Sequence, residues 1–206
     1  NCIYNPLNTK EIIKNSKIKQ KENFFSKKKN YLNIINIGRF TNQKDQITLL
    51  KAAKYLKDKI KFKLLILGRG KEQNNLKKYI KENNLSKHVK IKNFMNNPYP
   101  TIKKSDLFVL SSKYEGLPNV ILEALTLKKF VISSNCPTGP KEILLNGRGG
   151  LLFKVGDHID LSNKIIYYLK NKSKSKKMLA NSIINLDRFD YASNLNKYYN
   201  LVKEKL

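Results

Sequence analysis

The sequence predicts an α/β protein in which a parallel β-sheet carries helices on both faces, and three observations support this. Short, continuous apolar runs alternate along the chain with segments whose apolar residues recur at helical spacing. An apolar run without polar alternation is typical of a parallel strand that is buried on both faces. The 206 residues, 40% hydrophobic and 28% charged, suffice for one domain or two small ones and argue against a disordered chain.

The first half of the chain contains three of these apolar runs. Leu49, Leu50 and Ala53 lie at helical spacing between the first two runs. The run that ends in Gly38 is rich in β-branched residues and predicts the first strand. In this half we expect strands at residues 32–38, 62–67 and 89–91, helices at 45–58 and 72–84, and a helical turn at 98–104.

The second half continues the alternation and then becomes helical. We expect strands at residues 107–110, 130–133 and 149–153, helices at 119–127 and 140–145, and two or three helices between 161 and 206. The whole pattern is that of a Rossmann-like domain over residues 31–188 with C-terminal helices. Residues 1–30 are polar, carry the run Lys27-Lys28-Lys29, and are interpreted as a linker or leading segment.

The net charge of +27 is unusual, because Lys and Arg number 42 against 15 Asp and Glu. Such a balance suits nucleic acid, an anionic membrane surface or phosphorylated ligands. Only four of the cations are arginine, the residue that favours guanine readout and bidentate phosphate contacts. Lys, Asn and Ile are all abundant and all have AT-rich codons, so genome drift on a solvated surface explains the charge about as well. No specific nucleic-acid partner is expected.

Other features exclude several protein classes. No apolar run approaches the roughly 18 residues of a membrane helix, and the N-terminus does not have the pattern of a signal peptide. The sequence lacks an initiator Met, which suggests that it begins inside a longer protein. Cys2 and Cys136 cannot form a disulfide framework, so a reducing compartment is the simpler expectation.

Ligands of parallel sheets bind beyond the carboxyl ends of the strands, and the segment after the first predicted strand contains two cations. Gly38 permits a sharp turn, Arg39 offers a planar fork of donors, and Lys44 adds a point charge. Together these side chains could hold a diphosphate. The alternative is two solvated cations in a lysine-rich chain.

The segment after the fourth predicted strand contains two acids that bracket a turn. Gly116 and Pro118 predict the turn, and Asn119 is expected to cap the helix that follows, whose first N–H groups would attract an anion. Glu115 lies in the loop and Glu123 lies about one turn into the helix, so both carboxylates could accept hydrogen bonds from sugar hydroxyls. The alternatives are a solvated loop acid and an ordinary helix acid.

With these residues the sequence resembles the C-terminal, nucleotide-sugar-binding half of a family 4 retaining glycosyltransferase with the GT-B fold. The resemblance extends over about residues 30–170. It is carried by Gly38-Arg39 with Lys44, residues 105–112, Glu115-Gly116-Leu117-Pro118-Asn119 with Glu123, and residues 136–144 and 147–152.

The resemblance implies a role for each matching residue. Arg39 and Lys44 would grip the donor diphosphate and, with Glu115, form the catalytic set, in which Glu115 holds hydroxyls of the transferred sugar. Glu123 would hold the ribose hydroxyls. The remaining donor-binding positions would be Gly38, Lys92, Asn93, Gly116, Leu117, Pro118 and Asn119, with the backbone of Lys92 and Asn93 facing the base. No metal or other cofactor is expected, and no cluster of His, Cys and Asp has metal-ligand spacing.

The sequence also departs from the family pattern. The family usually has a Gly and then a Pro before the fifth strand, where this chain has Lys128 and Phe130. Since a non-Gly residue in a left-handed turn costs about 1 kcal/mol, the turn is expected to differ. Asn93 stands where Gly is common, although Asn tolerates that conformation. The N-terminal Rossmann-like domain that would bind the acceptor is missing, and residues 189–206 resemble the final helix that crosses back to it.

These observations predict the donor-binding half of a glycosyltransferase that uses a nucleotide-diphosphate sugar, most plausibly a UDP-sugar. The acceptor would be a saccharide or a lipid-linked saccharide in surface-glycan synthesis. The protein would be cytoplasmic, with peripheral contact at the anionic inner face of the membrane. Two alternatives stay open: a nucleotide-binding module without transfer activity, and a basic nucleic-acid-binding protein whose affinity falls steeply with salt.

Overall fold

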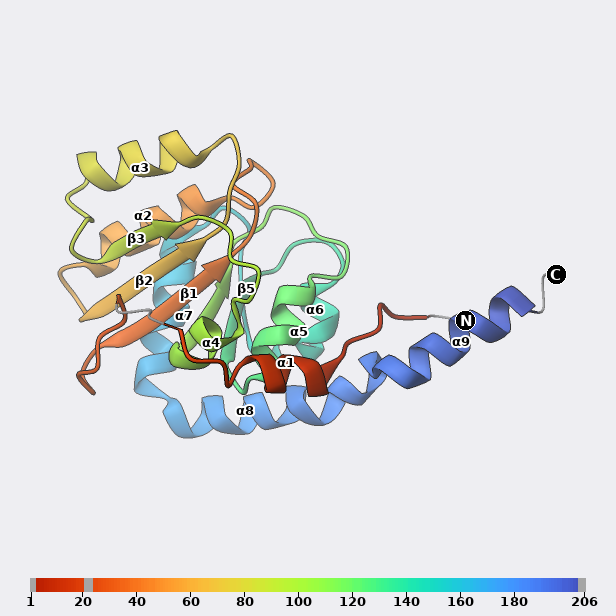
Figure 1. The fold of residues 1–206 in the computed structure, drawn as a ribbon. Coiled ribbons are helices and arrows are strands. Elements are labelled where there is room, and N and C mark those ends of the chain that lie inside the picture. Colours follow the sequence, from red (N-terminus) through yellow and green to blue (C-terminus); the bar gives the residue numbers. More distant parts are fainter. Residues whose placement is uncertain (1–2, 21–23, 204–206) are drawn as a thin grey trace.

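The computed structural model describes residues 3–20 and 24–203 and contains one six-stranded sheet (Figure 1). The strands are β1 (Leu32–Ile37), β2 (Phe62–Leu67), β3 (Val89–Lys92), β4 (Leu107–Leu110), β5 (Phe130–Ser134) and β6 (Leu151–Phe153). All of them pair in parallel, in the order β3-β2-β1-β4-β5-β6. The predicted α/β fold class with a parallel sheet is therefore confirmed.

Helices cover both faces of this sheet. The α-helices are α1 (Thr9–Asn15), α2 (Gln46–Leu56), α3 (Gln73–Glu82), α4 (Tyr99–Lys104), α5 (Asn119–Thr126), α6 (Pro140–Ile143), α7 (His158–Lys170), α8 (Lys172–Ile184) and α9 (Tyr191–Lys203). Two short 3₁₀ helices, η1 (Leu145–Gly147) and η2 (Asn185–Phe189), complete the elements. No helix among the described residues is long and apolar enough to cross a membrane.

The continuous apolar runs are explained by burial on both faces of the sheet. Every residue of β1 is buried, and its successive side chains point to opposite sides. Ile34 belongs to the core beneath α2, α3 and α7, whereas Ile35 belongs to the core beneath α1, α4 and α5. The same alternation separates Val109 from Phe108 in β4.

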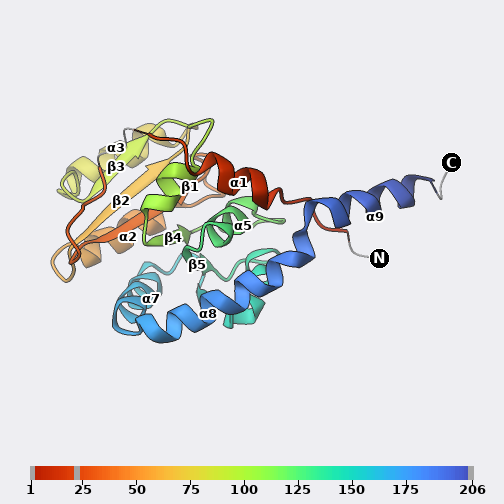
Figure 2. The ribbon, with the colours of Figure 1, turned by 60° about the horizontal axis from the view of Figure 1, so that its bottom comes forward.

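The predicted leading segment contains an element that its composition did not reveal. Residues 9–15 form α1, which Asn8 caps by accepting from the N–H of Glu11, and which buries Ile12. Just before α1, the N–H of Leu7 donates to the carbonyl of Phe189 at 2.8 Å. The N-terminal segment thus lies beside the start of α9, which projects away from the body of the protein (Figures 1 and 2). The expected roles of these two segments, an interdomain linker and a crossing helix, stay predictions.

The turn before β5 keeps a left-handed residue although it has no glycine. Lys128 has φ of 57°, so the expectation of a different turn at this position is wrong. The N–H groups of Lys128 and Lys129 donate to the carbonyls of Leu125 and Ala124, which ends α5 as a glycine would. Asn93, by contrast, is not among the described residues with positive φ, so its backbone does not adopt the left-handed conformation.

Candidate functional site

The sheet has its topological switch point between β1 and β4. The chain runs outward from β1 through β2 to β3 and then returns to place β4 on the other side of β1. In such sheets a crevice opens between the loops that follow the two strands. These loops, residues 38–45 and 111–118, contain most of the predicted site residues, and hydrogen bonds join them directly. The N–H of Lys113 donates to the carbonyl of Gln43 at 2.8 Å, and the Ser111 hydroxyl donates to the carbonyl of Lys44 at 2.9 Å.

The centre of the site is an ion pair between the two loops. The Lys44 ammonium donates to both carboxylate oxygens of Glu115, at 2.6 and 2.8 Å. The Ser112 hydroxyl donates to the same carboxylate at 2.6 Å. The side chains are only 16% exposed for Lys44 and 6% exposed for Glu115, so water screens this pair weakly. The structure therefore brings together the two oppositely charged residues that the sequence places in separate loops.

Arg39 lies in the same loop as Lys44 but is exposed to solvent. Its guanidinium takes part in none of the ion pairs among the described residues, while its backbone carbonyl accepts from the Gln46 side chain at 3.0 Å. The adjacent Phe40 is fully buried and anchors the loop. The result is a fixed backbone that presents a cation to solvent beside the buried pair.

Two glycines allow this loop to lie close against its neighbour. A Cβ atom on Gly68 would lie 2.0 Å from the carbonyl oxygen of Gly38, and one on Gly70 would lie 2.4 Å from that of Phe40. Gly70 also has φ of 154°. The Gly68-Arg69-Gly70 segment, which the sequence marks only as a turn, thus supports the loop that carries Arg39 and Lys44.

The turn after Glu115 leads into α5 without a side-chain cap. Pro118 takes the N-cap position, and Asn119 is the first helical residue, so the prediction that Asn119 caps the helix is wrong. No side chain of the N-cap residue therefore caps the N–H groups of the first turn. Behind the turn, the Thr138 hydroxyl donates to the carbonyl of Glu115. A Cβ atom on Gly139 would lie 1.9 Å from the carbonyl oxygen of Gly116, so the two loops are in direct contact.

Glu123 lies in α5 and is largely buried. Burial raises the pKa of the Glu123 carboxyl, and a hydrogen bond with Tyr99, at the start of α4, opposes that rise. The pKa of Tyr99 rises to about 12, mainly through burial and then through the nearby carboxylates of Glu123 and Glu11. Glu123 is therefore held in a partly dry position next to a hydroxyl donor.

The predicted base-facing residues lie at the same edge of the sheet but farther along it. Lys92 ends β3, which β2 separates from β1, and Asn93 follows it. The Lys92 carbonyl accepts from the N–H of Gly68 at 3.1 Å, and the Asn93 side-chain oxygen accepts from Gln73 at 3.4 Å. Next to them Phe94 is 58% exposed, and the Arg69 guanidinium lies 5.8 Å from its ring centre.

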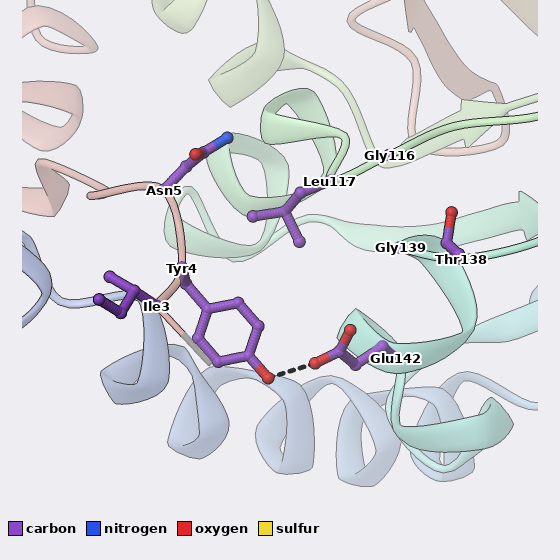
Figure 3. Close-up of a pocket in the computed structure, with 8 residues that line it drawn as sticks. All are labelled: Ile3, Tyr4, Asn5, Gly116, Leu117, Thr138, Gly139 and Glu142. Atoms are coloured by element: carbon purple, nitrogen blue, oxygen red, sulfur yellow. Dashed lines mark hydrogen bonds between the residues drawn. The ribbon is translucent and has the colours of Figure 1, made fainter. Parts of the chain in front are cut away.

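A pocket of about 210 Å³ adjoins the turn after Glu115 (Figure 3). Gly116, Leu117, Thr138, Gly139 and Glu142 line one side, and the N-terminal segment 3–5 lines the other. The Tyr4 hydroxyl donates to the Glu142 carboxylate across the pocket, as Figure 3 shows. Arg188 approaches the same carboxylate at 3.8 Å. This network fastens the N-terminal segment beside the loop that carries Glu115.

Sequence reasoning missed several polar residues that organise the site. Ser112 and Thr138 hold Glu115, and Tyr99 holds Glu123, through the contacts above. The Gln43 side chain donates to the carbonyl of Tyr114 at 3.0 Å. The sequence could have indicated Ser112, because it is the second residue after a predicted strand. The others act on residues distant in the chain. In the described ranges no group of three or more His, Cys, Asp or Glu residues is arranged to hold a metal ion.

The chain is similar to known glycosyltransferases in sequence, and to a solved structure in fold. An uncharacterized glycosyltransferase of Methanocaldococcus jannaschii is 42% identical over 61% of this chain and 30% of its own length. A Campylobacter jejuni N-acetylgalactosaminyltransferase that acts on a diphospho-undecaprenol-linked sugar is 32% identical over 69% of this chain and 41% of its own length. The crystal structure of Anabaena HepE in complex with UDP and glucose has a TM-score of 0.78 and 22% identity, and the match covers 84% of this chain and 48% of that one.

The chain spans less than half the length of these relatives. The structural likeness confirms the predicted Rossmann-like fold as one half of a GT-B fold. A sequence model of the family described as glycosyl transferases group 1 matches residues 15–184, which is most of the sequence. The chain accordingly belongs to the glycosyl transferases group 1 family.

Proposed function

We propose that this chain is the donor-binding half of a family 4 retaining glycosyltransferase, which takes a sugar from a nucleotide-diphosphate sugar and passes it to a saccharide or lipid-linked acceptor. The observation that carries the proposal is the buried Lys44–Glu115 pair at the switch point of the sheet. A buried ion pair contributes little to stability compared with apolar packing, so its presence at the switch point, where sheets of this class bind ligands, favours a functional role.

The cations of the first loop would act on the diphosphate. Arg39 is exposed and can form two parallel hydrogen bonds to phosphate oxygens. Lys44 keeps a fixed position through Glu115 and needs no reorganisation when charge develops on the departing nucleotide. Positive groups already in place where negative charge develops are an effective way to lower the barrier. In this proposal the two cations do what a metal ion does in other transferases.

The second loop would hold the sugar and the phosphate next to it. Glu115 has acceptor capacity beyond Lys44 and Ser112, which suits hydroxyls of the transferred sugar. The turn through Gly116, Leu117 and Pro118 leads into the uncapped N-terminus of α5 with Asn119, where free N–H groups favour an anion.

The nucleoside would lie farther along the same edge of the sheet. Glu123, with Tyr99 next to it, would accept from the ribose hydroxyls. The backbone at Lys92 and Asn93 would face the base, with Phe94 exposed alongside. UDP is the proposed nucleotide, and the UDP complex of Anabaena HepE supports this choice.

The acceptor and the second domain are proposed from the relatives. The Campylobacter jejuni relative acts on a lipid-linked sugar, and this supports an acceptor of that class in surface-glycan synthesis. We infer that an N-terminal Rossmann-like domain of the longer protein covers the exposed face of α9. That face presents Tyr191, Leu195, Tyr198, Tyr199, Leu201 and Val202. A cytoplasmic location with peripheral contact to an anionic membrane agrees with the net charge of +27.

The test is a calorimetric titration of the chain with UDP, GDP, ADP and CMP at moderate salt, with and without EDTA. Arg39→Ala and Glu123→Ala should each weaken UDP binding about tenfold or more, because each removes a hydrogen bond in which one partner is charged. Arg148→Ala removes an exposed cation outside the crevice and serves as the matched control. EDTA should change nothing. Equal binding of all four nucleotides, insensitive to Glu123→Ala, would overturn the proposal.

A further inference from the structure

A cationic groove lies at the opposite edge of the sheet, where the strands begin. Two adjoining cavities of about 400 and 130 Å³ share Asp106 and Lys172 as lining residues. Leu32 and Phe130, the first residues of β1 and β5, lie in their walls. The donor site occupies the carboxyl edge, so this groove is separate from it. Its cations, called the groove lysines below, are Lys29, Lys61, Lys128, Lys172 and Lys176.

The positive charge of the groove is local and does not follow from composition alone. Five lysines and one acid, Asp106, line the two cavities. Another cavity, of about 360 Å³ near α2 and α3, has two lysines balanced by Asp45 and Glu72. The pocket beside Tyr4 has Glu142 and no basic residue in its lining. Lysines are spread along the whole chain, yet the linings of these other two cavities have no excess of cations, whereas the lining of the groove does.

The groove lysines are exposed and outnumber the one acid among them, Asp106, and Lys172 packs over an aromatic ring. The Lys172 ammonium lies 3.5 Å from the ring centre of Tyr168, which stacks on Phe130 at 4.9 Å. Burial lowers the pKa of Lys172, and Asp106 only partly opposes this. Among the ion pairs of the described residues, none involves a groove lysine. Asp106 itself accepts from the N–H of Asn33 at 2.8 Å.

Two further features add hydrogen-bond donors to this edge. The 13-residue helix α8 begins at Lys172, and no side chain caps it, so N–H groups of its first turn are free of a side-chain partner. Ser175, one turn on, lines the smaller cavity, and its buried hydroxyl has no hydrogen-bond partner in the described part of the chain. Helix N-termini and lysines both favour anions, and a phosphate can accept from several donors at once.

We propose that this groove binds a phosphate group, as a second anion site distinct from the donor site. The groove lysines supply the charge, and Tyr31, Ile60 and Leu169 give the larger cavity an apolar wall for the rest of the ligand. A phospholipid headgroup and a free phosphorylated compound share this chemistry. The inference does not depend on the proposed function, because no residue of the crevice takes part.

The experiment is an amide NMR titration of the full chain with sodium pyrophosphate. Saturable shifts are expected at residues 128–130 and 172–176. The double variant K172Q/K176Q should weaken this binding about tenfold, since two charges facing the groove are lost. The double variant K174Q/K177Q is the matched control, because it removes the same charge from the same helix at residues that do not line the cavities, and it should change affinity less than about twofold. Thermal melting shows whether each variant is folded.

Two results would overturn the proposal: shifts confined to residues 38–44 and 115–119, or equal weakening by the two double variants. Sedimentation with phosphatidylcholine vesicles, with and without phosphatidate, then distinguishes a lipid headgroup from a free phosphorylated compound. Binding that needs phosphatidate, is lost in K172Q/K176Q and is displaced by pyrophosphate identifies a lipid headgroup. Pyrophosphate binding without vesicle binding identifies a free phosphorylated compound.

Discussion

The Lys44–Glu115 pair permits a quantitative test of how the site is held before any donor arrives. The perturbation is a double-mutant cycle with Lys44→Met, Glu115→Gln and the two together. Both replacements keep the approximate size of the side chain and remove its charge. The ammonium lies 2.6 and 2.8 Å from the two carboxylate oxygens, and the side chains are 16% and 6% exposed. Each single variant therefore leaves one charge without its partner in a place that water barely reaches.

The expected magnitude follows from this burial. Removing one partner of a buried pair costs about 3 kcal/mol, since the remaining charge is uncompensated. The double variant has no stranded charge, so the two single losses should exceed the double loss by about 2–3 kcal/mol. For a chain of this size, each single variant should lower the Tm by roughly 6–12 °C.

Urea unfolding followed by circular dichroism measures all four proteins. The control cycle uses Lys78 and Glu82, an exposed pair on α3 at 3.8 Å with side chains 75% and 57% exposed. Exposed pairs of this kind couple by less than about 0.5 kcal/mol. If the two cycles gave the same coupling, the pair at the crevice would not be a buried interaction in solution. The inference that Lys44 is held in advance for a diphosphate would then fail.

Three further predictions concern the backbone and the buried acid. Lys128→Gly should raise the free energy of unfolding by about 1 kcal/mol, because Lys128 has φ of 57°, whereas Lys128→Ala should gain nothing; equal effects in urea unfolding would contradict this. Gly139→Ala should cost about 2 kcal/mol or more and abolish UDP binding, because its Cβ would meet the Gly116 carbonyl at 1.9 Å; a melt and a UDP titration check both. Glu123→Gln should stabilise the protein at pH 7 while weakening UDP binding. Burial raises the pKa of Glu123, so its ionised form destabilises the folded protein only as the pH rises through that pKa. The stabilisation by Glu123→Gln should therefore vanish in acid, and thermal melts at pH 7 and at acidic pH would show this.

The architecture was predictable because burial on both faces leaves a simple mark in the sequence. Strand β4, buried along its whole length, is an uninterrupted apolar run, whereas the runs of β1 and β2 are mostly apolar but include Asn33, Asn36 and Lys63. Alternation with helical segments then leaves a parallel sheet as the natural arrangement. The carboxyl-edge rule locates the loops of Arg39, Lys44 and Glu115 without any structure. What the rule does not give is which side chains of those loops meet.

The parts that were missed depend on contacts between distant residues. Helix α1 is seven residues long and mostly polar, too short to show a periodic pattern, and it is held by packing of Ile12. Asn119 is of a residue type that often caps helices, but Pro118 is the N-cap residue, with an extended backbone at φ of −77° and ψ of 94°. Tyr99 reaches Glu123 only because α4 packs against α5. No local signal in the sequence reports any of these contacts.

Two of the six non-glycine residues with positive φ in the described part of the chain lie next to the predicted site. Asp45 has φ of 45° where the first loop enters α2, and Thr138 has φ of 59° where the supporting loop meets Glu115. Each left-handed residue costs about 1 kcal/mol, so each must be held by its surroundings. Asp45 caps the N–H of Thr48 and accepts from its hydroxyl at 2.7 Å, and the Thr138 hydroxyl donates to the carbonyl of Glu115. Both strained residues are thus tied to the loops that carry Lys44 and Glu115. Relaxing either one would move a charged group of the pair, so the strain is retained as part of the geometry that places the two charges together.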